Sequence, residues 1–341
     1  MPELRLDPLT GLRAIVAGER ADRPGAEFGV EPEPPLDPES DPFLEGHEDR
    51  TPPEIWADRP GGGEPDGPGW MVRVVPNLYP ALASAPDGEA SLRGESIAEP
   101  GDPLAAARGE PALFPSRPAV GAHEVIVSAP TPDVSLLGLE PIQAGRAMEA
   151  WRTRMRAHSE ASCVHLIVNE GRRAGASLPH SHAQLYALPF VPAAIARERE
   201  RFTAYANRWQ GRNLLADVLQ EEVRLGDRVV AIDNEAVAIC PFASRVPFQV
   251  QILPRRPRPR FEDDGPVATA LLQEVLTRLT RVLGATPPLN LWVRTAPRGA
   301  EHFCWRIDLL PRLTNEAGLE LGAGINICTL APERAAELLR G

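Results

Sequence analysis

An internal repeat constrains the fold of this chain more than any other feature of its sequence. Residues 123–130, HEVIVSAP, are echoed by residues 248–254, FQVQILP. In each half, this strand-like segment is followed by a segment of helical periodicity, a second strand-like segment, and a strand that stops at a proline. The repeat predicts two copies of one structural unit.

The order of elements within each copy predicts an α+β fold. We expect two tandem units, each an antiparallel sheet with packed helices. The first domain is expected to span residues 1–191 and the second residues 192–341. Residues 25–69 and 84–118 are rich in proline, glycine and acidic residues, so we expect both segments to be irregular. Apolar spacing predicts helices over 140–160, 192–223 and 267–283.

The composition excludes several classes of function. A net charge of −11 argues against a nucleic-acid or anionic-membrane surface. No apolar run approaches the ~18 residues of a membrane helix, and the N-terminus carries no signal pattern. The 4 cysteines form no C-x-x-C pair. We therefore expect a cytoplasmic protein with reduced thiols.

The segment 175–184, GASLPHSHAQ, carries the most distinctive chemistry. Alternate residues of a strand share one face, so His180, His182 and Gln184 are expected to point the same way. Two imidazoles and a carboxamide suit a site that holds and attacks a phosphate. Aligning the final strands of the two copies on their prolines gives three correspondences: His180 with His302, His182 with Cys304, and Gln184 with Arg306.

At these motifs the chain resembles the galactose-1-phosphate uridylyltransferase family of the histidine-triad superfamily. The resemblance covers nearly the whole chain and rests on seven segments in family order. They are residues 41–54, 75–81, 123–127, 175–184, 240–244, 252–255 and 307–312. Ser181 stands where the family usually has proline.

The resemblance implies a two-step nucleotidyl transfer through a covalent nucleotidyl-histidine. His182 matches the nucleophile, and its other ring nitrogen then needs an acceptor, for which we expect a nearby backbone carbonyl. Gln184 would donate to the phosphate in the transition state.

Further residues match nucleotide-binding or phosphate-binding positions of the family. These are Ser177 with the backbone amides of Gly175 and Ala176, then Asn169, Asn77 and His180. Turn capping is the structural alternative for Ser177, and Asx turns are the alternative for the two asparagines. His180 could also serve only to shape its strand.

The metal positions of the family are mostly lost, so we expect no bound metal and no other cofactor. Of the four zinc positions, two cysteines are replaced by Asp41 and Leu44, and the third ligand falls near Pro132. Only His180 remains, which cannot hold zinc tetrahedrally.

A second metal of some family members would lie on Glu198, but its histidine positions are Arg294, Cys304 and Arg306 here. Arginine offers only donors. We hypothesise that a salt-bridged cluster of Glu198 with the two arginines replaces that ion.

Three functions compete. The first is a hexose-1-phosphate uridylyltransferase, exchanging UMP between a UDP-sugar and a hexose 1-phosphate. The second is a phosphorylase or adenylyltransferase that uses ADP-glucose or a dinucleoside polyphosphate. The glycine-rich segment 317–324 resembles that divergent branch of the family. The third is a degenerate nucleotide binder without catalysis. The expected partners are a nucleotide sugar and a sugar 1-phosphate, and the family implies a homodimer.

Overall fold

The structure is a computed structural model, and it describes residues 1–19, 28, 30, 36–83 and 118–341. The expected irregular segment 84–118 therefore lies outside the described residues except at its last position. Within 36–69 the chain forms turns, a short 3₁₀ helix η2 (Glu48–Arg50) and a short strand β3 (Trp56–Asp58).

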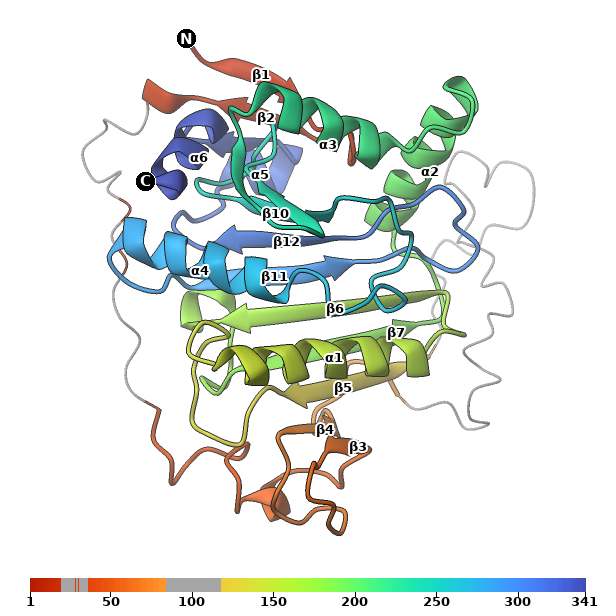
Figure 1. The fold of residues 1–341 in the computed structure, drawn as a ribbon, viewed down its shortest axis with the longest axis vertical. Coiled ribbons are helices and arrows are strands. Elements are labelled where there is room, and N and C mark those ends of the chain that lie inside the picture. The colour runs from red at the N-terminus through yellow and green to blue at the C-terminus, as the bar shows by residue number, and fades with distance from the viewer. Residues whose placement is uncertain (20–27, 29, 31–35, 84–117) are drawn as a thin grey trace.

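A single 10-stranded sheet runs through the molecule in the order β3-β4-β5-β7-β6-β11-β12-β10-β9-β8 (Figure 1). All of its neighbouring strands are antiparallel. The first half of the chain contributes β3, β4 (Val72–Pro76), β5 (Ala122–Val127), β6 (Cys163–Glu170) and β7 (His182–Leu188). The second half contributes β8 (Val229–Ile232), β9 (Ala236–Ile239), β10 (Val250–Pro254), β11 (Leu289–Arg294) and β12 (Arg306–Pro311).

The strand order confirms the repeat. The series β5-β7-β6 in one half is mirrored by β10-β12-β11 in the other, and β6 pairs with β11 at the centre. Helix α1 (Pro141–Ala157) connects β5 to β6, and α4 (Thr269–Leu283) connects β10 to β11. The α+β fold is as expected. The boundary at residue 191 stays a prediction, since the two units share one sheet.

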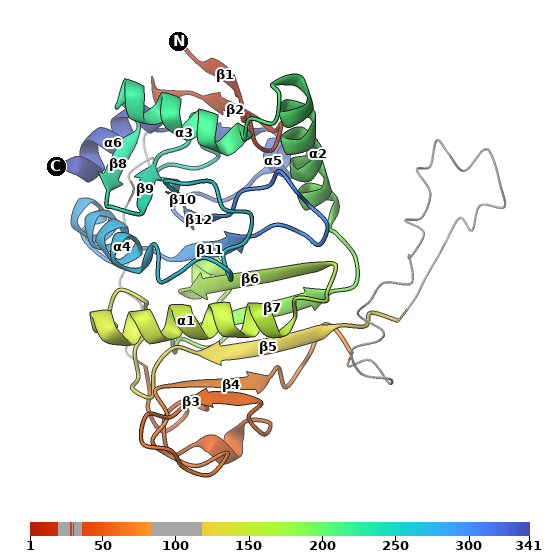
Figure 2. The same ribbon diagram turned by 45° about the vertical axis from the view of Figure 1, so that its right-hand side comes forward.

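One face of the sheet is covered by α1 and α4, which lie side by side in front of it (Figures 1 and 2). Alternate strand residues point to this face, so apolar residues at every second position build the main core. On β6 and β7 these include Val164, Leu166, Val168, Ala183 and Leu185. Trp151 of α1 packs there fully buried. His182 and Gln184 alternate with these core residues and therefore face the other side.

The opposite face is covered only in part. Over the second half of the sheet lie α2 (Ala193–Arg208) and α3 (Leu214–Leu225), whose Phe202 and Leu215 pack on strand residues such as Leu253. The single helix expected over 192–223 is wrong, because the chain turns at Gln210 and Gly211, both with positive φ. Asn213 then caps α3 by accepting hydrogen bonds from the amides of Leu215 and Ala216.

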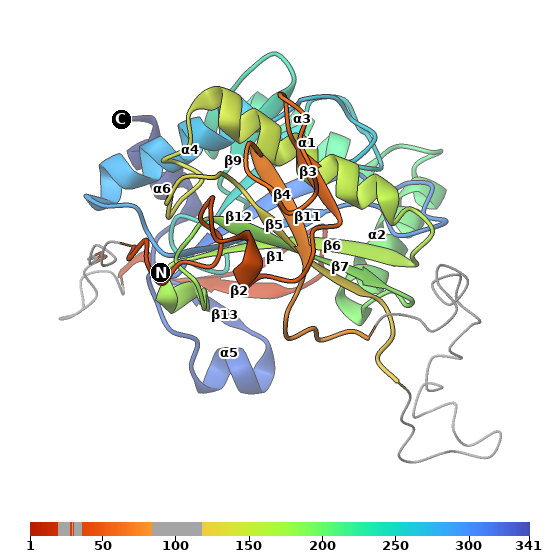
Figure 3. The same ribbon diagram turned by 90° about the horizontal axis from the view of Figure 1, so that it is seen from below.

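A second sheet of 3 strands has the order β1-β2-β13. Its strands are β1 (Glu3–Leu6), β2 (Arg13–Val16) and β13 (Asn326–Cys328), and two short helices flank β13, α5 (Gly318–Ala323) and α6 (Pro332–Arg340). Figure 3 shows α5 on the side of the main sheet opposite α1. Within the described residues, no helix is long and apolar enough to cross a membrane.

Candidate active site

His182 begins β7 on the sheet face opposite α1, and the residue is 8% exposed. Its Nδ1 lies 2.7 Å from the backbone carbonyl oxygen of His180. A carbonyl only accepts, so Nδ1 carries the proton and donates it. Burial lowers the pKa of His182 below the ordinary histidine value. The ring is therefore neutral near pH 7, with a lone pair on Nε2 free to attack an electrophile.

Gln184 is held in one orientation by two donors. Its Oε1 lies 3.0 Å from the hydroxyl of Tyr186 and 3.0 Å from Nε2 of His123. His123 Nδ1 accepts from the amide of Ala81 at 3.1 Å, so the proton of the neutral ring sits on Nε2 and points at Gln184. Burial lowers the pKa of His123, which favours this neutral form. With Oε1 occupied, the carboxamide nitrogen is the group left to donate to a ligand.

The two asparagines differ in their surroundings. Asn169 lies on β6 beside His182 on the neighbouring strand. Its Oδ1 accepts from Nδ2 of Asn290 at 2.8 Å, and the same nitrogen also donates to the carbonyl of Ala174 at 2.7 Å. Asn77 accepts from the amide of Tyr79 at 2.9 Å, as in an Asx turn, and its Nδ2 lies 3.2 Å from Nε2 of His123, so its nucleotide-binding role stays a prediction.

The turn between β6 and β7 contains the 3₁₀ helix η5 (Arg172–Ala174) and a left-handed Gly175, φ +87°. The amides of Gly175 and Ala176 donate inside the turn, at 3.0 and 3.2 Å, so the expectation that they hold phosphate is not supported. Ser177 is exposed, and among the described residues its hydroxyl has no partner. Ser177 is thus the donor that this turn leaves for a ligand.

Both ring nitrogens of His180 are taken by protein acceptors, so nothing here supports phosphate binding by this side chain, which stays a prediction. It is 1% exposed, with Nδ1 2.6 Å from Oδ2 of Asp41 and Nε2 2.9 Å from the carbonyl oxygen of Ala129. Both partners accept, so the ring satisfies them when it carries both protons and forms a buried ion pair with Asp41. His180 serves the site through its backbone carbonyl, which orients His182.

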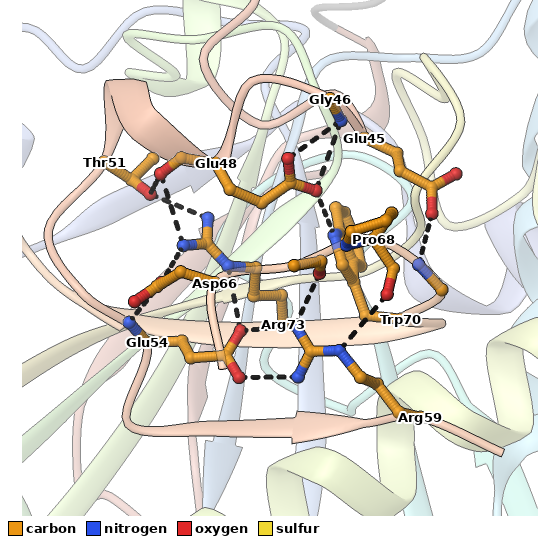
Figure 4. A network of polar contacts seen from close by, with 12 residues as sticks. Glu45, Gly46, Glu48, Thr51, Glu54, Arg59, Asp66, Pro68, Trp70 and Arg73 are labelled. Carbon is orange, nitrogen blue, oxygen red and sulfur yellow. Dashed lines mark hydrogen bonds and ion pairs between the residues drawn. The ribbon is translucent and has the colours of Figure 1, made fainter. Parts of the chain in front are cut away.

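Asp41 belongs to a loop that forms one wall of the site. Phe43 lies edge-on to the ring of His182, with 5.2 Å between centroids. A polar network anchors the segment that follows Phe43 to β4 (Figure 4). Buried Arg73 donates to Thr51 at 2.7 Å and to Asp66 at 2.6 Å, and Glu48 accepts from the indole of Trp70 at 2.7 Å. Side-chain hydrogen bonds within the protein therefore hold this wall of the site in place.

The chain is similar in sequence and in fold to several known proteins. Residues 73–192 match the model of the galactose-1-phosphate uridyl transferase N-terminal domain. ADP-glucose phosphorylase of Arabidopsis thaliana is 28% identical over 99% of this chain and 92% of its own length. Its crystal structure with bound ADP-glucose covers 100% of this chain and 99% of its own, with a TM-score of 0.78 and 25% identity. Galactose-1-phosphate uridylyltransferase of Cryptococcus neoformans is 27% identical over 86% of this chain and 74% of its own length.

Residues 73–192 thus match the N-terminal domain of the galactose-1-phosphate uridylyltransferase family, and the whole chain is similar to proteins of that family. It is accordingly an enzyme of the nucleotidyltransferase class. The histidine-triad arrangement inferred from the sequence is consistent with this assignment.

The family's zinc position does not fit zinc in this chain. Asp41 and His180 are the two potential ligands there, and they bond to each other at 2.6 Å. The second nitrogen of His180 is taken by the carbonyl of Ala129. Within the described part of the chain, no group of three or more His, Cys, Asp or Glu side chains could hold a metal. The absence of a metal from the protein stays a prediction.

The second metal position also does not fit a cation. The ion pairs expected from the sequence are present: Glu198 Oε1 lies 3.3 Å from Arg294 Nε, and Oε2 lies 2.9 Å from Arg306 Nη1. Arg306 Nε also lies 2.9 Å from Oδ2 of Asp308. Cys304 instead packs in the apolar cluster with Phe202.

Sequence reasoning missed three residues of the site. His123 and Tyr186 orient Gln184, and Asn290 orients Asn169. The signal for Tyr186 was available, because it shares the alternate-residue face of His182 and Gln184. Asn290 comes from the other repeat, so its approach depends on the pairing of β6 with β11.

Proposed function

We propose that the protein transfers the adenylyl group of ADP-glucose to inorganic phosphate through a covalent nucleotidyl-His182. The hydrogen bond from His182 Nδ1 to the carbonyl of His180 carries this proposal. It fixes the tautomer whose Nε2 lone pair is available, and the pKa lowered by burial keeps that lone pair free of a proton.

In the first step, His182 Nε2 forms a bond to the α-phosphorus of ADP-glucose. The bond from that phosphorus to the bridging oxygen breaks, and glucose 1-phosphate leaves with the electron pair. The phosphoimidazole gains positive charge, which the Nδ1 hydrogen bond to His180 stabilises. Inorganic phosphate then attacks the same phosphorus, the P–N bond breaks, and ADP leaves with neutral His182 restored.

The other groups of the site would hold the phosphates. Gln184 presents its carboxamide nitrogen because Oε1 is already occupied by two donors. Asn169 lies beside His182 on β6, and Ser177 lies in the turn that precedes β7. Such donors stabilise the transition state when they are oriented before the reaction.

The choice of ADP-glucose rests on likeness across the whole chain. The Arabidopsis phosphorylase matches 99% of this chain at 28% identity. The glycine-rich segment 317–324 favours the same branch. The uridylyltransferase of Cryptococcus, at 27% identity over 86% of the chain, supports transfer of UMP from a UDP-sugar as the second candidate.

One experiment separates the candidates. The protein is incubated with ADP-glucose or UDP-glucose labelled at the α-phosphorus, and the protein-bound label is counted for wild type and His182→Ala. We expect a label from ADP-glucose that is absent in His182→Ala and is discharged as ADP on addition of inorganic phosphate. Label from UDP-glucose alone would establish the uridylyltransferase. Absence of label with both substrates would leave a nucleotide binder and sink the proposal.

The proposal includes a cytoplasmic homodimer, which the family implies. Light scattering on the purified protein measures its mass in solution. A mass of one chain at micromolar concentration would contradict the dimer.

A further inference from the structure

A second cavity, of about 120 Å³, opens on the same sheet face as His182. Its lining includes Arg245, Trp292, Arg294, Arg306, Glu198 and Asp308. Cross-strand pairs run from Gln184 to Ile167 and from Ile167 to Trp292. Trp292 therefore lies two strands from Gln184, roughly 10 Å away at the usual strand spacing. At that distance the cavity is separate from the atoms that react at His182.

The carboxylates of this cavity are already occupied. Glu198 is paired with Arg294 and Arg306, at 3.3 and 2.9 Å. Asp308 accepts from the carboxamide of Gln251 at 2.7 Å and lies 2.9 Å from Arg306. Asp7, the third carboxylate of the lining, accepts from the amide of Leu9 at 2.8 Å and from the hydroxyl of Thr10 at 2.6 Å. Each carboxylate of the lining therefore already has a partner, at the position where some family members bind a second metal.

Two hydrogen-bond donors of this cavity, by contrast, lack an acceptor among the described residues. Among the described residues, the guanidinium of Arg245 makes no hydrogen bond or ion pair and lies 5.4 Å from the ring centroid of Trp292. The indole Nε1 of Trp292 is buried and has no hydrogen-bond partner there. Burial lowers the pKa of Arg245, opposed in part by Asp308, so the charge of this arginine is incompletely balanced. An added anion would supply both the missing charge and the missing acceptors.

We propose that this cavity binds a small phosphate anion, held by Arg245 over Trp292, in place of the cation that the family binds there. Arginine binds phosphate through two parallel N–H groups, which suits a tetrahedral oxyanion. The volume is well below the ~300 Å³ at which sites for drug-sized ligands begin, so a nucleotide sugar does not fit. The ligand is therefore inorganic phosphate or the phosphoryl group of a small metabolite. The site lies apart from His182, so the proposal does not depend on the proposed function.

The test is calorimetric titration of the full chain with inorganic phosphate and, separately, with glycerol 3-phosphate. Five proteins are compared: wild type, Arg245→Gln, Arg245→Lys, Arg208→Gln and Ser177→Ala. Arg208 is the matched control, because it also stacks on a tryptophan at 5.4 Å but lies at the exposed end of α2. Ser177→Ala reports phosphate bound at the turn beside His182.

We expect saturable phosphate binding that Arg245→Gln weakens by about 10- to 100-fold, as for loss of a charge-assisted hydrogen bond. Arg208→Gln should bind as wild type does, and Ser177→Ala should keep the binding component that Arg245→Gln weakens. Arg245→Lys, which keeps the charge but loses the fork, should fall between, and it tests the idea if Arg245→Gln fails to fold. Equal affinity for glycerol 3-phosphate identifies a phosphoryl group as sufficient, and preference for inorganic phosphate identifies the free anion. Absence of saturable binding, or binding that survives Arg245→Gln, would overturn the proposal.

Discussion

Nδ1 of His180 lies 2.6 Å from Oδ2 of Asp41, across 139 residues of sequence, and both side chains are buried. This contact occupies the place of a zinc site in the family. It joins the loop that carries Phe43 to the strand that carries His182. A direct ion pair thus makes the connection that a metal makes elsewhere.

Removal of the Asp41 carboxylate should therefore weaken both fold and site. We expect Asp41→Ala to lower the free energy of unfolding by about 1–3 kcal/mol, because it leaves the buried Nδ1 of His180 without its hydrogen-bond partner. Adduct formation at His182 should slow by about 10-fold or more, because the Phe43 wall and the His180 carbonyl lose their anchor. Denaturant unfolding and single-turnover labelling measure the two effects. Asp41→Asn, which keeps one acceptor, should show smaller losses; equal losses in both variants would contradict this account.

The pH dependence of adduct formation should reflect the environment of His182. The reactive ring is neutral, and burial lowers its pKa. The rate should therefore stay constant as the pH falls towards 6.5, the ordinary histidine value, and decline only below it. Single-turnover labelling from pH 8 to 4.5 tests this, with His182→Ala as the blank. A midpoint at or above 6.5 would show that the ring is not shielded in this way.

Tyr186→Phe tests whether the hydrogen bonds to Oε1 hold the carboxamide of Gln184 in its orientation. The change removes one donor to Oε1 but keeps the ring that stacks on His123, with 4.2 Å between centroids. We expect kcat to fall by about 2- to 10-fold, the effect of one neutral hydrogen bond, with KM nearly unchanged. Tyr205→Phe, which loses a hydroxyl bonded to Asp217 at 2.7 Å, is the control on the other half.

If Tyr186 acts by positioning Gln184, a double variant provides a second test. In the background of Gln184→Ala, Tyr186→Phe should have no further effect on kcat, because there is no carboxamide left to orient. An undiminished effect in that background would assign Tyr186 a different role.

The sequence predicted the fold well, because the fold depends on local patterns, while the role of His182 as nucleophile stays a prediction. Alternation along β7 placed His182 and Gln184 on one face, and the repeat anticipated the mirrored strand order. The function of Asp41 could not be predicted, since in the sequence it stands only as a missing cysteine. Likewise Asn290 reaches Asn169 through a strand pairing between the two halves, which no local pattern encodes. The break between α2 and α3 could have been predicted from Gly211, a residue typical of turns, and Asn213, a residue typical of helix N-caps. The helical periodicity of the flanking residues favoured a single helix instead.

Glu170 should make the stability of the protein depend on pH. Its side chain is buried on the helix side of β6, against a cavity of about 250 Å³, and accepts from Ser135 at 2.8 Å and from the amide of Leu136 at 2.6 Å. Burial raises its pKa to about 7. The folded state thus prefers the protonated acid, and stability present below pH 4.5 is lost as the pH rises through 7.

Glu170→Gln should remove this loss, because a carboxamide stays neutral. Relative to wild type, the variant should gain stability between pH 5 and 8, by at most about 3 kcal/mol at about 1.4 kcal/mol per pKa unit. Denaturant midpoints across this pH range give the measurement. Parallel pH profiles for the two proteins would show that Glu170 ionises as it does in the unfolded chain.

The stability of the protein should depend on Glu198 as long as Arg294 and Arg306 are both present. It is 1% exposed and pairs with both guanidiniums, so Glu198→Gln leaves Arg294 without its ion pair and Arg306 paired with Asp308. We expect a loss of about 3–5 kcal/mol in the free energy of unfolding. Adding Arg306→Met should restore part of that loss, because it removes one of the two cations that Glu198 balances and keeps an apolar side chain of similar length. Losses that simply add in the double variant would show that the three residues do not act as one cluster.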